Sequence, residues 1–267
     1  MKTKGFRDLR TELLKDLFFP ARCPICSDAI PIEKRARLHI SPFDKGSRQL
    51  YYDGLICRGC LDSLKFITDP FCKKCGKQLA GRNDEMLCSD CLEKERLFDE
   101  CRCLVTYDET AREIMAEIKY NSKKEYMDIF ALLAADRLGD WLKAAGASCL
   151  VPVPVHGSRL KSRGFNQAEV LAEGISAFTG IPVRNDVLIR LKNTAAQKNL
   201  GADDRLLNLQ NAFTAVGKLK NGEIPVIIDD IYTTGSTMEA CTEGLLGIGA
   251  RRVYGLCVCA GEDTADK

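Results

Sequence analysis

The stretch Pro225-Val-Ile-Ile-Asp-Asp-Ile-Tyr-Thr-Thr-Gly-Ser-Thr-Met238 decides the fold of this 267-residue chain. A short β-branched run ends in two adjacent acids, a cluster of glycine and hydroxyl residues follows, and a helical pattern comes next. This order predicts a strand of an open α/β sheet, where ligands bind at the carboxyl ends of the strands. Gly235 can adopt the backbone conformations that direct successive amides toward an anion, and the following helix adds its N-terminal dipole. The stretch therefore predicts a phosphate-binding loop.

A simpler interpretation of the same residues is a helix start. Ser236 and Glu239 match a capping box, which needs no ligand. Capping does not explain Asp229 and Asp230, because two adjacent carboxylates repel unless ribose hydroxyls, a metal or a developing positive charge engages them. Acid pairs at strand ends also occur as simple magnesium sites. A nucleoside-triphosphate P-loop is disfavoured, since no Gly-Lys-Ser/Thr occurs in the chain.

The segment from Val226 to Thr237 resembles the phosphoribosyl-pyrophosphate (PRPP) loop of type I phosphoribosyltransferases. The resemblance implies that Asp229 and Asp230 meet the ribose hydroxyls, and it makes these two acids the catalytic candidates. It further implies that the 5-phosphate is held by the residues that follow, which are Thr233, Thr234, Gly235, Ser236 and Thr237.

A second anion-binding segment is expected after the apolar run at 148–155. Pro152 and Pro154 cannot donate ladder hydrogen bonds, so the end of this run should leave the sheet early. The loop from His156 to Gly164 then carries Arg159, Lys161 and Arg163, just before a helix that Asn166 can cap. Such cations are usually only solvated, but beside a phosphate loop Arg159 and Arg163 can bind the pyrophosphate of the same ligand.

Eight of the 14 cysteines form four Cys-x2-Cys pairs near the N-terminus. Two such pairs supply the four sulfurs of a closed tetrahedral zinc site, so the sequence predicts two structural Zn2+ ions, with iron and sulfur as the minor alternative. Sequential pairing is preferred over a cross-braced arrangement, which uses the same residues. The segment 31–50 between the first two pairs is expected to be a polar insertion. The predicted ligands are Cys23, Cys26, Cys57, Cys60, Cys72, Cys75, Cys88 and Cys91.

The other elements follow from local patterns. An amphipathic helix is expected at 6–18. Strands are expected at 103–107, 181–191 and 252–258, and a helix capped by Thr110 and Glu113 should precede a second helix that ends near residue 145. Lys119 suits either a ligand contact or the surface. The segment 192–209 is a long polar loop, a length at which loops are often functional lids. Cys149, Cys241, Cys257 and Cys259 are expected in the core.

Composition narrows the class of protein. The formal charge of +2 does not require a nucleic acid or a membrane as partner. No apolar run approaches the length of a membrane span, which predicts a cytoplasmic protein.

The change in pattern near residue 101 predicts an N-terminal helix and double zinc-ribbon domain at 1–100. An α/β domain at 101–267 is expected to follow.

Several motifs together resemble the ComF family over nearly the whole chain: Val151-Pro-Val-Pro-Val-His156, Arg163-Gly-Phe-Asn-Gln167, the series Arg190, Thr194, Gln197, Arg205 and Asn208 with Asn211-Ala-Phe213, the PRPP loop and the paired cysteines. The resemblance implies a type I phosphoribosyltransferase fold, mainly a parallel sheet flanked by helices, preceded by a double zinc ribbon. It implies a mobile loop at 192–205, and Mg2+ bound together with PRPP. The long insertion between Cys26 and Cys57 departs from the family pattern.

The resemblance also implies a function in DNA uptake during natural competence or in nucleotide metabolism. If the protein is an enzyme, the expected reaction is transfer of a 5-phosphoribosyl group to an acceptor. No residue of the sequence identifies this acceptor. The alternative is a binding module without turnover, in which the loop binds a phosphate ligand and the ribbons dock single-stranded DNA or a partner helicase. Type I relatives often dimerise, so a homodimer is a further expectation.

Overall fold

The computed structural model describes residues 22–23, 25–30, 35–40, 50–190, 212–220 and 222–263, with the backbone alone at 35–40 and 50–55. The helix expected at 6–18 and the loop expected at 192–209 lie outside the described residues. Among the helices within these ranges, none is both long enough and apolar enough to cross a membrane.

A parallel four-stranded sheet forms the centre of the molecule, in the order β3-β8-β7-β4. Its strands are nearly all buried along their length, because helices cover a parallel sheet on both faces. The edge strand β4 ends at Pro152, as the prolines predicted. The strands are β3 (Glu100–Thr106), β4 (Cys149–Pro152), β7 (Pro225–Tyr232) and β8 (Tyr254–Ala260).

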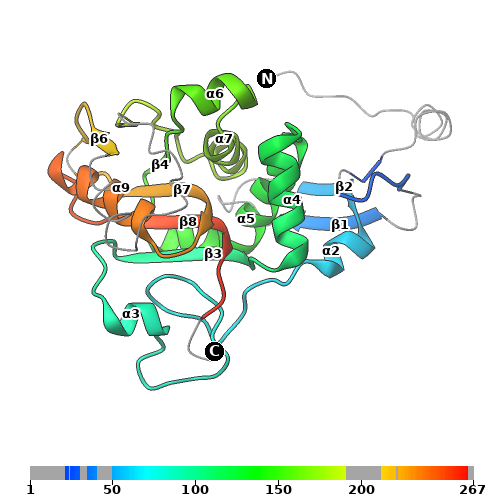
Figure 1. Ribbon diagram of the computed structural model, residues 1–267, viewed down its shortest axis with the longest axis horizontal. Helices are drawn as coiled ribbons and strands as arrows, with labels where there is room; N and C mark the ends of the chain where they lie inside the picture. Colours follow the sequence, from blue (N-terminus) through cyan, green and yellow to red (C-terminus); the bar gives the residue numbers. More distant parts are fainter. Residues whose placement is uncertain are drawn as a thin grey trace.

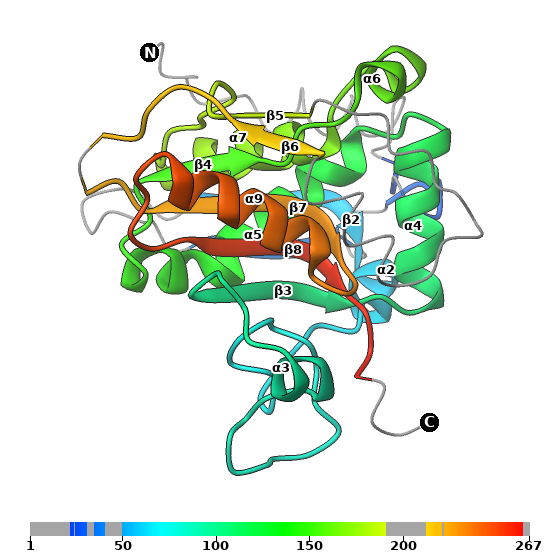
Figure 2. The same ribbon diagram turned by 60° about the vertical axis from the view of Figure 1, so that its left-hand side comes forward.

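The helices form two layers around this sheet (Figures 1 and 2). On one face α5 (Glu125–Ala144) packs against α7 (Gln167–Thr179), and α4 (Glu109–Tyr120) lies beside α5. On the other face α9 (Ser236–Gly247) packs against β7 and against the hairpin of β5 (Leu188–Arg190) and β6 (Phe213–Ala215). The expected α/β architecture of a parallel sheet flanked by helices is thus confirmed.

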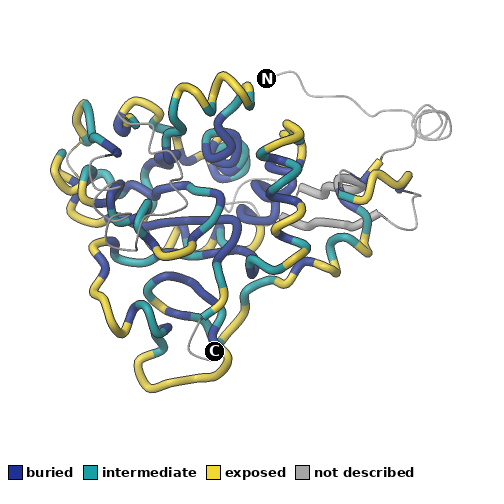
Figure 3. Tube along the Cα trace, viewed as in Figure 1, coloured by how far each residue is buried: buried dark blue, intermediate teal, exposed yellow. Residues whose placement is uncertain are grey.

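The cysteine-rich region contacts both layers. Its first half, with β1 (Arg35–Ile40), β2 (Leu50–Cys57) and α2 (Arg58–Ser63), contributes Ile30 and Ile56 to the core beneath α4 and α5. Its second half, which contains α3 (Ser89–Glu93), joins the core on the opposite face through Leu79 and Phe98. Figure 3 shows that the second half of this region has both exposed segments and buried ones.

The segment expected to be a polar insertion contains a strand. β1 pairs with β2 in an antiparallel hairpin, with a register shift between Arg35 and Arg37. Polar and apolar residues alternate in the sequence RARLHI of Arg35–Ile40, which is the pattern of a strand. The prediction missed this strand because the segment contains many charged residues.

Two expected helix starts are wrong. The side chain of Asp108, rather than Thr110, caps α4 by accepting a hydrogen bond from the backbone N–H of Ala111 at 3.0 Å. Gly235 is the N-cap of α9 and Ser236 is its first helical residue, so Ser236 and Glu239 do not form a capping box. In both places the turn before the helix, and not the box motif, determined where the helix begins.

Strand limits also differ from expectation. Of the strand predicted at 181–191, only β5 is regular, because a turn at Asn185 and Asp186 interrupts it. The last strand begins and ends two residues later than predicted, at Tyr254 and Ala260. The predicted loop at 156–164 is largely a short helix, α6 (Gly157–Arg163), which ends at Gly164 with φ of 82°.

Candidate functional site

The loop between β7 and α9 has the geometry of an anion cradle. Gly235 has φ of 80°, in the left-handed region, and precedes the first turn of α9. A β-carbon at this position would lie 2.3 Å from the Tyr232 hydroxyl, so only glycine fits. The Thr234 and Ser236 hydroxyls are 2.9 Å apart. A cavity of about 80 Å³ lies here, lined by Asp229 and by residues 231–238 and Cys257.

The two acids at the end of β7 have different environments. Asp230 is buried, and its Oδ2 accepts hydrogen bonds from Lys119 Nζ at 2.8 Å and from Gln167 Nε2 at 3.0 Å. Asp229 is half-buried, and its Oδ1 accepts a hydrogen bond from the backbone N–H of Asp230 at 2.9 Å. The structure therefore places Lys119, whose role the sequence left open, at the site.

These environments separate the pKa values of the pair. Removal from water, together with the neighbouring Asp230 charge, raises the pKa of Asp229 to about 8. Burial alone would also raise the pKa of Asp230, but the charge and hydrogen bond of Lys119, with help from Gln167 and Arg163, lower it below its ordinary value. The pair thus holds one negative charge next to one that appears only above neutral pH.

Cations from a neighbouring segment face the acid pair. Arg163, the last residue of α6, donates from Nη1 to Gln167 Oε1 at 3.0 Å, which connects it to Asp230 through the glutamine. Burial and the nearby Arg159 charge lower the pKa of Arg163. Asn166 caps α7 as predicted, because its Oδ1 accepts from the Ala168 N–H at 3.1 Å. Of the two candidate arginines, Arg163 is therefore linked to the acid pair, and the Arg159 charge acts on Arg163.

Three residues near the acids or the loop that follows them were not predicted as site residues. Gln167 and Arg190 belong to the motifs quoted for the family resemblance, but nothing in their types assigned them a role. The Arg190 guanidinium lies 5.1 Å from the centre of the Phe213 ring, and burial together with the nearby Arg159 charge lowers its pKa. Arg96, from the cysteine-rich region, donates from Nη1 to the Thr234 carbonyl at 3.1 Å. No local pattern in the sequence pointed to Arg96.

The paired cysteines form two compact clusters, grouped in sequential order. One cluster contains Cys23, Cys26, Cys57 and Cys60, and the other contains Cys72, Cys75, Cys88 and Cys91. In each, the four sulfurs lie within 4.8 Å of one another, which fits a single ion with four thiolate ligands. The second cluster is entirely buried, whereas Cys26 in the first is exposed.

A third group of sulfurs lies on the sheet itself. Cys101 and Cys103 of β3 and Cys257 of β8 are buried, and their sulfurs also lie within 4.8 Å of one another. Cys103 is paired with Cys257 in the parallel register, so neighbouring strands bring these thiols together. As expected, Cys257 is a core residue, and so are Cys149, Cys241 and Cys259.

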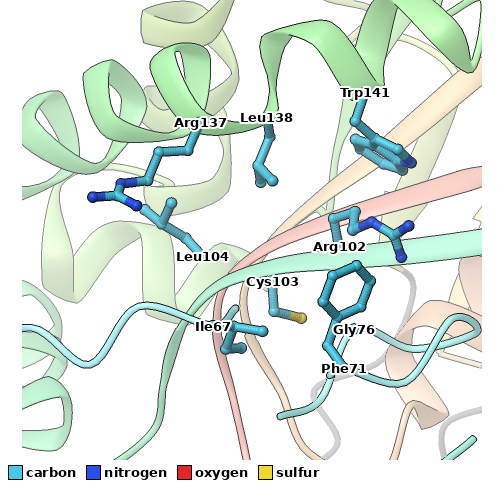
Figure 4. Close-up of a pocket in the computed structure, with 9 residues that line it drawn as sticks. All are labelled: Ile67, Phe71, Gly76, Arg102, Cys103, Leu104, Arg137, Leu138 and Trp141. Atoms are coloured by element: carbon cyan, nitrogen blue, oxygen red, sulfur yellow. The ribbon is translucent and has the colours of Figure 1, made fainter. Parts of the chain in front are cut away.

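A larger cavity, of about 330 Å³, lies away from the acids, between β3, α5 and the second half of the cysteine-rich region. Figure 4 shows the Arg102 side chain between two aromatic rings, and its guanidinium carbon is 4.4 Å from the Phe71 centroid and 5.8 Å from that of Trp141. The arginine thereby joins the two parts of the molecule. The cavity lies at the edge strand β3, and β8 separates β3 from β7, the strand that leads into the loop at 233–237.

Comparisons with known proteins give one family model and one solved structure. A double zinc ribbon domain model matches residues 47–104. A purine phosphoribosyltransferase from Pyrococcus horikoshii superposes with a TM-score of 0.31 at 18% identity, covering 50% of this chain and 72% of that chain.

Relatives cover more of the chain. Competence protein ComFC of Bacillus subtilis is 29% identical over 205 residues, 74% of this chain and 80% of that protein. DNA utilization protein YhgH of Salmonella typhimurium is 30% identical over 210 residues, 76% of this chain and 89% of that protein. Competence protein F of Haemophilus influenzae is 31% identical over 251 residues, which are 90% of this chain and 97% of that protein. The chain therefore belongs to the family of competence protein F, the ComF family.

Proposed function

We propose that this protein binds PRPP at the loop between β7 and α9 and transfers its 5-phosphoribosyl group. The observation that carries the proposal is the convergence of three features: an acid pair, a glycine-based anion cradle at a helix N-terminus, and cations from a separate segment. A sugar that bears a phosphate at one end and a pyrophosphate at the other requires this combination.

Each part of the ligand has a partner in this proposal. The amides and hydroxyls of residues 233–237 hold the 5-phosphate, aided by the dipole of α9. Asp229 and Asp230 accept hydrogen bonds from the ribose hydroxyls, while Lys119 stays in contact with Asp230. Arg159 and Arg163 bind the pyrophosphate. The acid pair and the phosphate groups suit a bound Mg2+, which would neutralise charge on the pyrophosphate.

The reaction would follow from the charges around the ribose. The bond between C1 and the pyrophosphate oxygen breaks, the pyrophosphate leaves with the electron pair, and C1 acquires oxocarbenium character before the acceptor adds. The Asp230 carboxylate, kept ionised by Lys119, favours the positive charge on the sugar. Arg163 favours the negative charge on the leaving group.

Membership of the ComF family supports a biological setting in DNA uptake or DNA utilisation, as the names of its relatives indicate. Structural zinc in the two four-cysteine clusters and a cytoplasmic location complete the proposal. A binding module without turnover, which docks single-stranded DNA or a helicase, is the second candidate, because the described residues around the acids offer no side chain placed as a base for an acceptor.

Titration calorimetry with PRPP and Mg2+ tests the site. The wild-type protein should bind, and the double variant Asp229→Asn plus Asp230→Asn should not, whereas Asp140→Asn, an exposed acid of α5, should bind normally. Equal affinity in the double variant would reject the site. Release of pyrophosphate is then measured against bases, nucleosides and single-stranded DNA, and silence with binding intact would favour the binding module.

A further inference from the structure

One arginine connects the second cysteine cluster to the phosphate loop. Arg96 is buried, with 7% of its surface exposed. Its Nη1 donates to the Thr234 carbonyl at 3.1 Å, and its Nη2 donates to the Asp90 carbonyl at 3.4 Å. Asp90 lies between Cys88 and Cys91, so a single guanidinium spans from the backbone of the cluster to the backbone of the loop.

The two residues that follow Arg96 also contact the phosphate-loop region. The backbone N–H of Leu97 lies 3.3 Å from both carboxylate oxygens of Glu239, in the first turn of α9. The Phe98 ring packs edge-on against Tyr232, with centroids 6.3 Å apart. These three consecutive residues therefore contact, in order, the Thr234 carbonyl, the first turn of α9 and the last residue of β7.

The loop has little space to move on this side. A β-carbon at Gly235 would lie 2.3 Å from the Tyr232 hydroxyl and 3.3 Å from Arg96 Nη1. The Tyr232 hydroxyl is buried and has no hydrogen-bond partner among the described residues. Tyr232 thus supports the loop by packing alone, and the Arg96 hydrogen bond fixes the carbonyl that precedes Gly235 and thereby orients the amides that follow.

A metal bound by the four cysteines would hold the second cluster in shape. Four thiolates around a divalent ion carry a net charge of about −2, and such a centre is stabilised by cations and donors around it. Lys77 supplies one cation, since its Nζ lies 2.6 Å from Asp90 Oδ2, and Arg96 supplies a second, since its Nη2 donates to the Asp90 carbonyl beside Cys91. Without a metal the four buried thiols lose what holds them together, and the turn that positions Arg96 loses its anchor.

We propose that Arg96 is a positioning residue that couples metal occupancy of the second cysteine cluster to the order of the phosphate loop. The zinc ribbon is then a part of the ligand site rather than a separate module. This inference rests on the proposed function for the identity of the ligand, although the coupling itself concerns only the protein. Because linkage is reciprocal, a ligand on the loop must also retain the metal in this cluster.

Hydrogen exchange of the full-length zinc-loaded protein tests the coupling without any ligand. The variants are Arg96→Met and Arg96→Lys, and the control is Arg58→Gln, whose side chain is 78% exposed. A hydrogen bond to a charged group is worth enough to raise exchange at residues 233–237 by about tenfold or more in Arg96→Met. Arg96→Lys should rescue part of it. Peptides from α7 should not change.

Unchanged protection at 233–237 in both Arg96 variants would overturn the proposal. Should Arg96→Met fail to fold, Arg96→Lys decides the matter alone, because a lysine cannot span both carbonyls and protection at 233–237 should still fall. Equal loss of protection over the whole chain would also count against a positioning role, since that result indicates general destabilisation.

Metal release provides the second measurement. With PRPP and Mg2+ present, a chelator should remove metal more slowly from the second cluster, and the first cluster serves as an internal control. Equal protection of both clusters would contradict the coupling. If calorimetry shows that the wild-type protein does not bind PRPP, the proposed function fails, and the exchange experiment still decides whether Arg96 orders the loop.

Discussion

Lys119 Nζ lies 2.8 Å from Asp230 Oδ2, at the point where a parallel strand ends in two acids. The lysine is the penultimate residue of α4, and a buried glutamine from α7 donates to the same oxygen. Three elements from separate parts of the chain therefore meet at one carboxylate. This contact keeps Asp230 ionised beside an Asp229 whose pKa is raised, and the predictions about the acids follow from it.

Replacing Lys119 with methionine should destabilise the protein. The substitution leaves Asp230 largely buried with no cation in direct contact, and Gln167 alone compensates only part of the loss. We expect the free energy of unfolding to fall by about 1–3 kcal/mol, measured by urea denaturation. Lys123→Met is the control, because the Nζ of Lys123 is exposed and 3.9 Å from Glu125, so the change should stay within about 0.5 kcal/mol. Equal losses in the two variants would contradict a special role for Lys119.

The raised pKa of Asp229 predicts a pH dependence of stability. Between its ordinary value of 3.8 and its folded value of about 8, the folded protein keeps a proton that the unfolded chain has lost. Stability from this group should therefore fall as pH rises through that range. Asp229→Asn removes the titration, so the melting temperature of the variant relative to wild type should increase from pH 5 to pH 8. A difference that does not change with pH would contradict the raised pKa of Asp229.

Gly235→Ala should damage the phosphate loop specifically. Alanine in the left-handed region costs about 1–2 kcal/mol, and here its β-carbon would also collide with the Tyr232 hydroxyl. Gly180→Ala is a matched control, because Gly180 has φ of 74° but open space around its β-position. Both variants should lose stability in thermal melts, but only Gly235→Ala should lose PRPP affinity in calorimetry. Full affinity in Gly235→Ala would exclude the loop as the phosphate site.

The two cysteine clusters should lose metal at different rates. Cys26 is exposed and Cys57 and Cys60 are half-buried, whereas all four sulfurs of the second cluster are buried. A chelator combined with an alkylating reagent should therefore label the first cluster before the second, as read by mass spectrometry of the peptides. Metal analysis of the untreated protein should find about two zinc ions per chain. Simultaneous labelling of both clusters would mean that burial does not control access.

Sequence alone determined what depends on neighbouring residues. The β-branched run before Asp229 and the glycine after Thr234 specify a strand and a tight turn, because both are local conformational preferences. The Cys-x2-Cys spacing likewise specifies pairs of metal ligands. The same locality explains the errors: the box motif of Ser236 and Glu239 is also a local signal, but tertiary packing directs Glu239 to Leu97 instead.

Tertiary structure decided which distant groups meet. The pairing order of the cysteines, the position of Lys119 at Asp230 and the contact of Arg96 with Thr234, 138 residues away in the chain, all depend on how layers pack around the sheet. A lysine or arginine can have the same sequence neighbours on a solvated surface and in a site. Its role therefore cannot be predicted from the residues next to it. The residue types of the site could be predicted from the sequence. Their contact partners could not, because only the folded, buried arrangement brings the charges together.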